Sequence, residues 1–455
     1  MMSRLIQLSN IVEGEERVRK LDIAEAMAIQ HSTNPIHTHT ATRWTIEAAK
    51  ETATRTQHKL STLPIKVIYR LLERAMDYYL VDEEDYNFIS DHTGNPIDFV
   101  CEGLCFINNW CRDLQPFYEQ CLKQESVYIK NSAPVVVVLP SNSDQEVGYV
   151  LAQTLLSRNA TIVRPSSQGA SAYATVAFVK AFNRAVDEES DPSLEFLKGA
   201  ISVIHTGTDY LKQLSVTGWN YIFFGSDQTI QKIRDKLYGY CTPRTLIGYG
   251  TGLSTSVVLE DADLEDAVEK VLQSITINTG NECVSTDIVY IHEAVYDSAV
   301  TQLNQQAKQI RVGDPLQREN IGCVMAANEA FIEQQLVQVR GKTLNRRGGH
   351  IAPTLVALHD YETTLEYPGP IASIRKFTSQ NHLAHLISRD LRDNEKSKNL
   401  VTSVFTQSTE QFKQLLPHLK AYMVKHNKAT HDFNISKPHQ GVMILEELVE
   451  RVYLD

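Results

Sequence analysis

The chain has 455 residues, of which 42% are hydrophobic and 22% are charged, and its formal net charge is -11 at pH 7. This length allows two or three domains that each bury a core, and the composition is that of a globular protein rather than a disordered one. The acidic balance argues against the clustered Lys and Arg that bind a nucleic-acid backbone, so we expect no nucleic-acid partner.

The N-terminal segment, MMSRLIQLSNIVEGEERVRK, reaches acidic residues before any apolar stretch of signal-peptide length. The longest strongly apolar run elsewhere, VVVVLP, is too short to cross a bilayer. We therefore expect a cytoplasmic protein without a membrane span.

The seven cysteines, an odd number, have neither CxxC spacing nor histidines at zinc-ligand spacing. Neither a disulfide framework nor a metal site is expected, and most of these thiols should be weakly reactive core residues. They lie at positions 101, 105, 111, 121, 241, 283 and 323.

Hydrophobic spacing predicts helices over most of residues 41–120, for example in LPIKVIYRLLERAMDYYL. Short β-rich runs then alternate with amphipathic helical stretches, which predicts a doubly wound, largely parallel sheet. A second α/β series starts near Thr245, and we place the boundary between the two domains near Leu246 to Tyr249. The strands expected in the first series are SVYIK, APVVVVLP, ATIVRP, AISVIHTG and WNYIFFG, and those in the second are STSVVLE, STDIVYIHE, IAPTLVAL, GPIASIRKF and LVTSVFT.

A polar loop, residues 141–144, follows the buried strand VVVVLP, and Arg164 ends the next strand. Ligands bind beyond the carboxyl ends of strands in an open parallel sheet, so both places suit a nucleotide. Asn142 in this loop could equally cap the following helix.

Cys283 lies in a Gly/Asn-rich turn, residues 278–285, between an expected helix and an expected strand. Such turns face solvent or a cleft, and their backbone N–H groups should favour the thiolate. From local sequence alone, a structural cysteine is the commoner interpretation.

The glycines of residues 248–252 imitate a dinucleotide fingerprint, but an expected strand follows them instead of a helix. We interpret them as a tight connection between domains. The chain contains no GxSxG, HExxH or GxxxxGK[ST] motif.

Taken in order from Thr93 to Gln440, these stretches resemble the aldehyde dehydrogenase superfamily. The matching motifs are TGNP, VVVVLPSN, VRPSS, FFGS, GYGTG, NTGNECVS and LEYPGPIASIRKF, and EDADLEDAVEKVLQSITINTGNEC is the most specific of the matching runs. The resemblance implies an α/β fold of two doubly wound domains with a small oligomerisation strand element.

The resemblance also implies roles for individual residues. Cys283 would be the nucleophile that carries a hemithioacetal or thioester, and Asn142 would stabilise the oxyanion together with the Cys283 backbone N–H. The cofactor would be NADP, with NAD possible. The residues expected to bind it are Pro140, Ser141, Arg164, Ser166, Ser167, Gly225, Ser226 and Glu366.

Three departures from the family pattern refine this expectation. Tyr249 occupies the place of the Glu that activates the hydrolytic water in most aldehyde-oxidising members, so an acyl-enzyme should persist until a thiol or hydride takes it. Ser167 replaces a Glu that repels a 2′-phosphate, and Arg164 replaces a Lys, which favours NADP. Pro368 replaces an aromatic residue, and FNISKPHQG stands in place of a PFGG motif.

The expected function is reduction of an acyl thioester, on coenzyme A or a carrier protein, to an aldehyde, or the reverse reaction. This pattern is similar to acyl-CoA reductases, including the fatty acyl reductase of bacterial bioluminescence. Three alternatives stay open: a hydrolytic aldehyde dehydrogenase, an acyl-phosphate reductase, and a pseudo-enzyme that binds or assembles.

The resemblance divides the chain into functional parts. Residues 1–247 would form the nucleotide-binding domain, to which the chain returns near 422–440, and residues 248–421 would form the catalytic thiol domain. Segments 121–133 and 443–453 match the family's oligomerisation strands, which predicts a homo-dimer or homo-tetramer.

Overall fold

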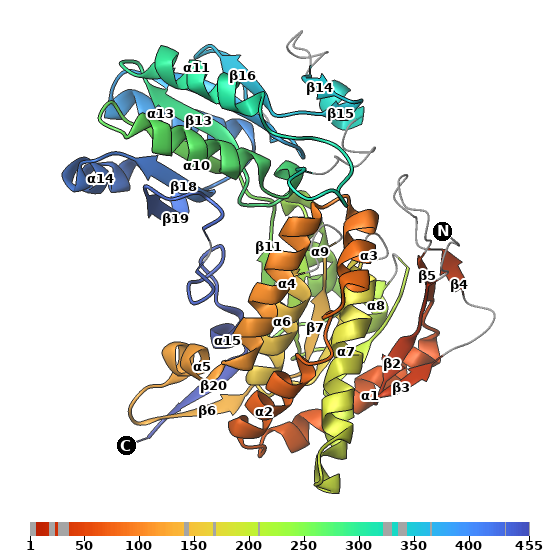
Figure 1. Cartoon of the computed structure of the whole chain (residues 1–455). Helices are drawn as coiled ribbons and strands as arrows, with labels where there is room; N and C mark the ends of the chain where they lie inside the picture. The colour runs from red at the N-terminus through yellow and green to blue at the C-terminus, as the bar shows by residue number, and fades with distance from the viewer. Residues whose placement is uncertain are drawn as a thin grey trace.

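The computed structural model describes residues 6–17, 23–25, 36–140, 145–166, 170–207, 210–321, 330–334, 344–364, 366–432 and 434–454. Figure 1 shows them as two α/β units, one above the other, with a two-stranded ribbon extending from the lower unit. The predicted architecture, two doubly wound units and a small strand element, is confirmed.

The lower unit is built on a seven-stranded sheet in the order β11-β10-β7-β8-β9-β2-β3. Strands β11 to β9 run parallel, and β2 and β3 form an antiparallel edge. All four valines of β7 are buried, as expected for a central strand covered on both faces. The strands are β2 (Asn10–Val12), β3 (Glu15–Arg17), β7 (Val135–Val138), β8 (Thr161–Arg164), β9 (Ile201–Val203), β10 (Asn220–Phe224) and β11 (Thr245–Tyr249).

Helices flank this sheet, and the helical segment predicted for residues 41–120 is confirmed. In α2 the buried residues Ile68, Leu71, Leu72 and Ala75 recur at helical spacing and form one stripe that faces the core. The helices are α1 (Arg43–Leu60), α2 (Ile65–Ala75), α3 (Glu83–Thr93), α4 (Ile97–Arg112), α5 (Gln115–Leu122), α6 (Gln145–Leu156), α7 (Ser171–Asp187), η1 (Pro192–Gly199), α8 (Tyr210–Leu214) and α9 (Asp227–Tyr240).

The upper unit contains a six-stranded parallel sheet in the order β16-β17-β13-β12-β18-β19. Its strands are β12 (Ser254–Val258), β13 (Thr286–His292), β16 (Thr354–Leu358), β17 (Ile371–Phe377), β18 (Asn399–Phe405) and β19 (Ala421–His426). Its helices are α10 (Leu264–Thr276), η2 (Ile277–Gly280), α11 (Tyr296–Ala307), α13 (Gln380–Asp393), α14 (Thr409–Leu415) and η3 (Leu416–His418). No helix in the described part of the chain is long and apolar enough to cross a membrane.

The structure corrects two of the predicted boundaries. Gly248 and Tyr249 belong to the lower sheet, because β11 continues through both residues in register with β10. The chain does not return to the lower unit at residue 422, because β19 pairs with β18 as the edge strand of the upper sheet.

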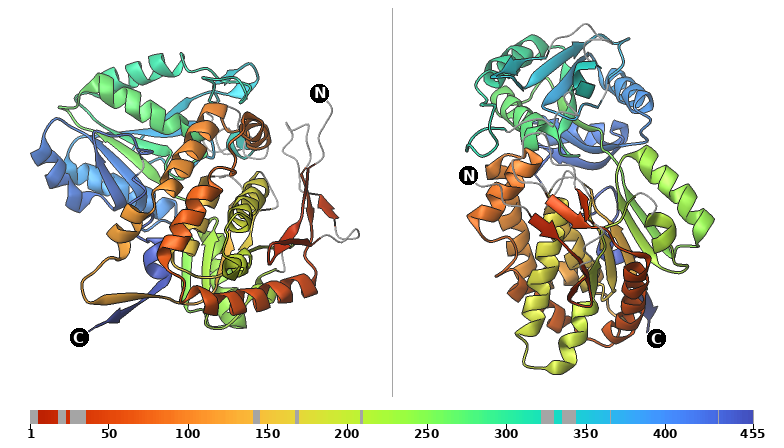
Figure 2. Two further views of the ribbon diagram at one scale, coloured as in Figure 1. Left: turned by 60° about the horizontal axis from the view of Figure 1, so that its bottom comes forward. Right: turned by 90° about the vertical axis from the view of Figure 1, so that its right-hand side faces the viewer.

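The predicted oligomerisation segments form an antiparallel pair, β6 (Val127–Asn131) with β20 (Val449–Tyr453). Only part of each segment is strand, because 121–133 begins with the last turn of α5 and 443–453 contains α15 (Ile444–Glu447). The ribbon projects away from both units, on the side opposite the N-terminal strands (Figures 1 and 2).

The remaining strands form two small sheets that the sequence did not predict. They are β1 (Ile6–Leu8), β4 (Ile23–Glu25) and β5 (Ile36–His39) in one sheet, and β14 (Arg346–Arg347) and β15 (His350–Ile351) in the other.

A short connection brings the two large sheets together edge to edge. Residues 250–253 alone join the carboxyl end of β11 to the amino end of β12. Because β13 lies parallel beside β12, the loop that precedes β13 is at this same edge. Cys283 is in that loop, so the fold places it where the carboxyl edge of the lower sheet meets the upper unit.

Candidate active site

The loop that leads to Cys283 has an unusual backbone. Asn278, Thr279 and Gly280 all have positive φ angles, of 45°, 58° and 75°. The left-handed conformation costs energy for residues with a Cβ atom, and such strain persists only where the surroundings hold it. At Gly280 a Cβ atom would lie 2.2 Å from the carbonyl carbon and oxygen of Gly369, so the loop is seated directly on the backbone of a second loop.

Cys283 is fixed through its own carbonyl group. The Ser254 hydroxyl donates a 3.1 Å hydrogen bond to the Cys283 carbonyl oxygen. A Cβ atom on Gly252 would come within 2.7 Å of the same oxygen, so the connection between the sheets packs tightly on the cysteine loop. Cys283 is a free, partly buried cysteine.

The thiol of Cys283 sits in electrostatically unfavourable surroundings for a thiolate. Burial raises its pKa well above the usual value, and the carboxylates of Glu282, Glu146 and Glu366 raise it further. The backbone N–H of Cys283 lowers the pKa, but its effect is smaller than those of burial and of the two nearest carboxylates. The Cys283 N–H thus favours the thiolate, as expected for this loop, but burial and the carboxylates outweigh it and keep the pKa of the thiol raised.

Glu282 is a carboxyl group that the sequence motifs did not single out. Its Oε1 accepts a 2.6 Å hydrogen bond from Nδ2 of Asn278. Burial raises the pKa of Glu282, and the hydrogen bond from Asn278 lowers it by less. A carboxyl with a raised pKa beside Cys283 is suited to accept or hold a proton.

Tyr249, which is expected at the place of the usual general base, is enclosed by other rings. Its ring stacks on Phe224 at 4.9 Å between centroids and lies 5.3 Å from the ring of His439. Its hydroxyl donates to the Val442 carbonyl oxygen at 3.4 Å. Burial raises the pKa of the Tyr249 phenol, so at neutral pH the phenol is protonated and is not a base.

Arg164, at the carboxyl end of β8, is held by two contacts. Its Nη2 donates to the Thr206 carbonyl oxygen at 3.3 Å, and its guanidinium lies 4.8 Å from the centre of the Tyr210 ring. Its Nε atom is buried without a hydrogen-bond partner. A buried donor without a partner is costly, and an anion at this place would satisfy it.

Two further predicted cofactor residues, Gly225 and Ser226, lie between the carboxyl end of β10 and α9. The Ser226 hydroxyl caps α9 by accepting a 3.2 Å hydrogen bond from the Thr229 backbone N–H. The start of α9 therefore points its N–H groups and positive dipole end toward the edge where a pyrophosphate would lie.

The other predicted residues are distributed as follows. Pro140 follows β7 and Ser166 follows β8 at the same sheet edge. Ser141, Asn142 and Ser167 lie outside the described residues.

Glu366 belongs to the upper unit, and its side chain is 31% exposed. It contributes to the raised pKa of Cys283, so the structure brings these two predicted residues together. Arg164, Gly225 and Glu366 thus supply a guanidinium with one unpaired donor, a helix start and a carboxylate, and this set fits a dinucleotide. The described residues contain no cluster of three or more His, Cys, Asp or Glu side chains placed to hold a metal.

A small cavity lies beside Val284, the residue that follows Cys283. Its lining includes Val284, Leu400, Met423, Lys425 and His439. The Lys425 ammonium donates to the carbonyl oxygens of Thr430 and Asp432, at 2.7 and 2.6 Å. Pro438, His439 and Gln440, from the segment that stands in place of the PFGG motif, line the same cavity as Val284.

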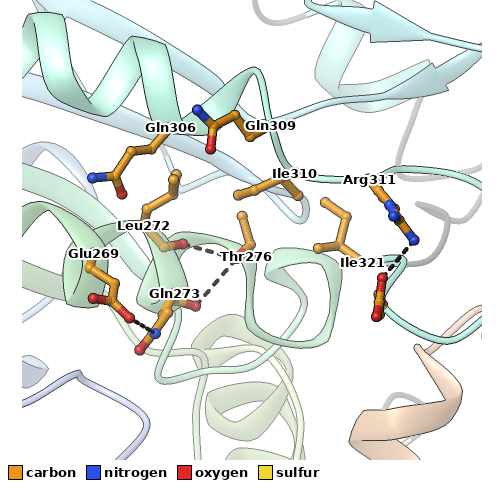
Figure 3. Close-up of a pocket in the computed structure, with 10 residues that line it drawn as sticks. Glu269, Leu272, Gln273, Thr276, Gln306, Gln309, Ile310, Arg311 and Ile321 are labelled. Carbon is orange, nitrogen blue, oxygen red and sulfur yellow. Dashed lines mark hydrogen bonds and ion pairs between the residues drawn. The ribbon is translucent and has the colours of Figure 1, made fainter.

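A larger hollow of about 660 Å³ lies between α10 and α11. Figure 3 shows its mainly polar side chains, several already bonded to one another, such as Glu269 with Gln273. It does not include Cys283, but its wall supports the nucleophile loop, because the Thr279 hydroxyl donates to the carbonyl oxygen of Ile321.

Comparison with known protein families gives one extensive match. A family model described as "Aldehyde dehydrogenase family" matches residues 24–443. The D-glyceraldehyde dehydrogenase (NADP(+)) of Thermoplasma acidophilum is 24% identical over 378 residues, 75% of this chain and 71% of that protein. Lactaldehyde dehydrogenase of Escherichia coli is 25% identical over 169 residues, 34% of this chain and 35% of that protein. Several curated relatives are thus matched over only about a third of their length.

Solved structures share the fold at low sequence identity. A salicylaldehyde dehydrogenase from Pseudomonas putida G7, crystallised with salicylaldehyde, has a TM-score of 0.81 at 15% identity, with 99% of this chain and 98% of that chain covered. An NADP-dependent enzyme from E. coli has a TM-score of 0.83 at 16% identity, with 99% of this chain and 98% of that chain covered.

Proposed function

The chain belongs to the aldehyde dehydrogenase family, and we propose that it reduces an acyl thioester to an aldehyde, or catalyses the reverse reaction, through an acyl adduct on Cys283. The Cys283 sulfur attacks the thioester carbonyl carbon, and its proton passes to a nearby carboxyl such as Glu282. The thiol of coenzyme A or of a carrier protein then leaves with a proton. Asn142 and the Cys283 backbone N–H stabilise the oxyanion that forms in between.

We further propose that the cofactor is NADP, with NAD as a weaker ligand. The dinucleotide would supply the hydride that releases the aldehyde. Arg164 and Ser167 would accept the 2′-phosphate, the Gly225-Ser226 turn the pyrophosphate, and Glu366 the nicotinamide ribose. NADPH should then support reduction at least as well as NADH, and Arg164→Ala should reduce that preference.

One observation carries the acylating assignment. Where the family's general base stands, this chain has Tyr249, a buried and protonated phenol. Water is a poor nucleophile without a positioned base, whereas a thiol can discharge an acyl-enzyme unaided at useful rates.

Acyl transfer without cofactor tests this assignment. Native protein is incubated with a panel of acyl-coenzyme A thioesters, and the adduct is located by peptide mass. We expect label on Cys283, discharge faster with added thiol than with water, and no label in Cys283→Ala. Cys241→Ala, which changes a buried cysteine of the lower unit, is the matched control. Steady-state conversion of an aldehyde to free acid without thiol would overturn the proposal.

A hydrolytic aldehyde dehydrogenase is the second candidate, and Glu282 is the feature that favours it. Its carboxyl lies beside Cys283 and has a raised pKa, so it is available to activate the hydrolytic water in place of the base that Tyr249 replaces. If the native protein releases free acid and Glu282→Gln abolishes that release, the hydrolytic function is correct and Glu282 is its base.

We also propose that the β6–β20 ribbon joins copies of the chain into a dimer or tetramer. Tyr128, Tyr453 and Leu454 are exposed on this ribbon, at 52%, 74% and 56%. Exposed apolar side chains on short open strands favour association. Light scattering of the native chain and of a Tyr128→Glu variant tests this proposal.

A further inference from the structure

Lys396 connects the two units at the edge where they meet. It lies in the turn between α13 and β18, and its side chain is 10% exposed. The ammonium donates to the Thr251 carbonyl oxygen at 2.9 Å and to the Thr251 Oγ1 at 2.7 Å. It also forms an ion pair with Asp227 and lies 3.8 Å from Oε2 of Glu366.

These partners belong to three parts of the molecule whose relative positions shape the proposed cofactor site. Asp227 is the first residue of α9 and directly follows the Gly225-Ser226 turn. Thr251 belongs to the connection between the two sheets, and Glu366 precedes the loop that supports Gly280. One ammonium group therefore ties the helix start, the connection and the carboxylate together.

We propose that Lys396 is a positioning residue for the cofactor, which holds the Glu366 carboxylate charged and directed along the cofactor edge. The inference rests on the proposed dinucleotide site. Lys396 acts through Glu366 and through the start of α9, and needs no contact with the dinucleotide itself. A ribose donates its hydroxyl hydrogens to a carboxylate, and charge-assisted hydrogen bonds of this kind are about twice as strong as neutral ones.

The charges around Glu366 explain why it needs this support. Burial raises the pKa of Glu366 to about 7, Lys396 lowers it, and Asp227 raises it. Asp287 and Cys283 also face Glu366, and both have raised pKa values to which its charge contributes. Lys396 is therefore the cation that opposes several acidic groups, and its loss should leave Glu366 protonated at neutral pH.

NADPH binding should weaken as the pH falls, because Glu366 then gains a proton. In the native protein NADPH should bind well when Glu366 is ionised and more weakly as the pH falls through about 7. Without Lys396 the midpoint moves to higher pH, and each unit of displacement costs about tenfold in affinity at a pH below both midpoints.

The experiment measures the dissociation constant of NADPH by fluorescence titration against pH, without substrate. Lys396→Met, which keeps most of the length of the side chain, should raise the midpoint and, for each unit of displacement, weaken binding about tenfold at pH 5.5. Lys396→Arg should restore both. Lys398→Met is the matched control, because Lys398 is exposed and lies over the Tyr422 ring. Glu366→Gln should make NADPH affinity independent of pH around 7. Adding Lys396→Met to Glu366→Gln should then cause no further pH-dependent loss of affinity.

The role of Lys396 is overturned if Lys396→Met leaves the pH midpoint of NADPH binding unchanged. It is also overturned if Lys396→Met weakens NADPH binding equally in the native and in the Glu366→Gln background. If the native protein and Lys398→Met both fail to bind NADPH at every pH, the proposed cofactor itself is wrong, and the inference falls with it. Melting temperatures are compared for all variants. Should Lys396→Met fail to fold, Lys396→Gln, which still donates to Thr251, replaces it and must show the same displaced midpoint.

Discussion

The side-chain amide of Asn278 donates a 2.6 Å hydrogen bond to the carboxyl of Glu282, the residue immediately before Cys283. Asn278 reaches this position because its backbone is left-handed, with φ and ψ both 45°. Strained conformations of this kind occur where the surrounding structure imposes them and often mark functional loops. The strained turn thus has an identifiable consequence, since it fixes a carboxyl group beside the nucleophile.

Replacing Glu282 tests that consequence directly. Glu282→Gln removes one of the negative charges that raise the pKa of Cys283, and its amide can still pair with Asn278. The thiol pKa should fall, so alkylation of Cys283 by iodoacetamide should become faster at pH 8 and its pH midpoint should move down by about one unit. Glu293→Gln, at an exposed position after β13, is the control. An unchanged or higher midpoint would show that Glu282 does not act on the thiol.

Gly280 should tolerate no side chain. Its φ of +75° disfavours any residue with a Cβ atom, and that atom would lie 2.2 Å from the Gly369 carbonyl. Gly280→Ala should therefore displace the loop, reduce labelling of Cys283 by at least tenfold and lower the free energy of unfolding by roughly 1–3 kcal/mol. Gly239→Ala is the matched control, because a Cβ atom there, on α9, meets nothing within 4 Å. Equal labelling in both variants would contradict the geometry of the loop.

The upper unit depends on a buried ion pair between Arg375 and Asp390. The Arg375 Nη2 and the Asp390 Oδ1 are 2.7 Å apart, and both side chains are fully buried. Asp390→Asn should leave an uncompensated buried cation and cost about 3–5 kcal/mol of unfolding free energy in urea titrations. Asp393→Asn breaks a more exposed contact with Arg392, and should cost less than about 1 kcal/mol. If Asp390→Asn lowers the free energy of unfolding by less than about 1 kcal/mol, the pair is not needed for stability.

Much of the fold could be predicted because its signals are local. The run VVVV predicts a strand buried on both faces, and the spacing of Ile68, Leu71, Leu72 and Ala75 predicts the inner face of a helix. The N-terminal strands were missed because each has only three or four residues and none lies in a β-rich apolar run such as VVVV. Strand β19 was missed because it is an edge strand of mixed polarity, AYMVKH, and only its pairing with β18 defines it.

The residues of the candidate site also differ in whether the local sequence reveals them. Cys283 could be singled out because its loop carries a motif, and Tyr249 because its register to the following strand is fixed, and the roles given to both stay predictions. Lys396 has no local signal, since its importance comes from three partners that the fold assembles. The raised pKa of Cys283 could not be predicted from its loop, because its main cause is burial in the folded chain, and the carboxylates of Glu146 and Glu366 come from other parts of the sequence.

The last prediction concerns Tyr249, on which the acylating proposal depends. Its side chain is 4% exposed and stacks on Phe224, so we expect it to act through packing and not as a base at the position that the family resemblance assigns to the general base. Tyr249→Glu introduces a carboxylate there and should raise hydrolysis of the acyl-enzyme relative to thiol transfer, by up to about 10²-fold if the carboxylate is well placed. Tyr249→Phe is the control, because it keeps the ring and removes only the hydroxyl bonded to Val442. It should leave the ratio of hydrolysis to transfer at the native value.

The measurement is the ratio of free acid to new thioester formed from acyl-labelled protein at a fixed thiol concentration. A Tyr249→Phe variant that loses hydrolysis present in the native protein would show that the phenol itself serves the water reaction, and would contradict its assignment to packing.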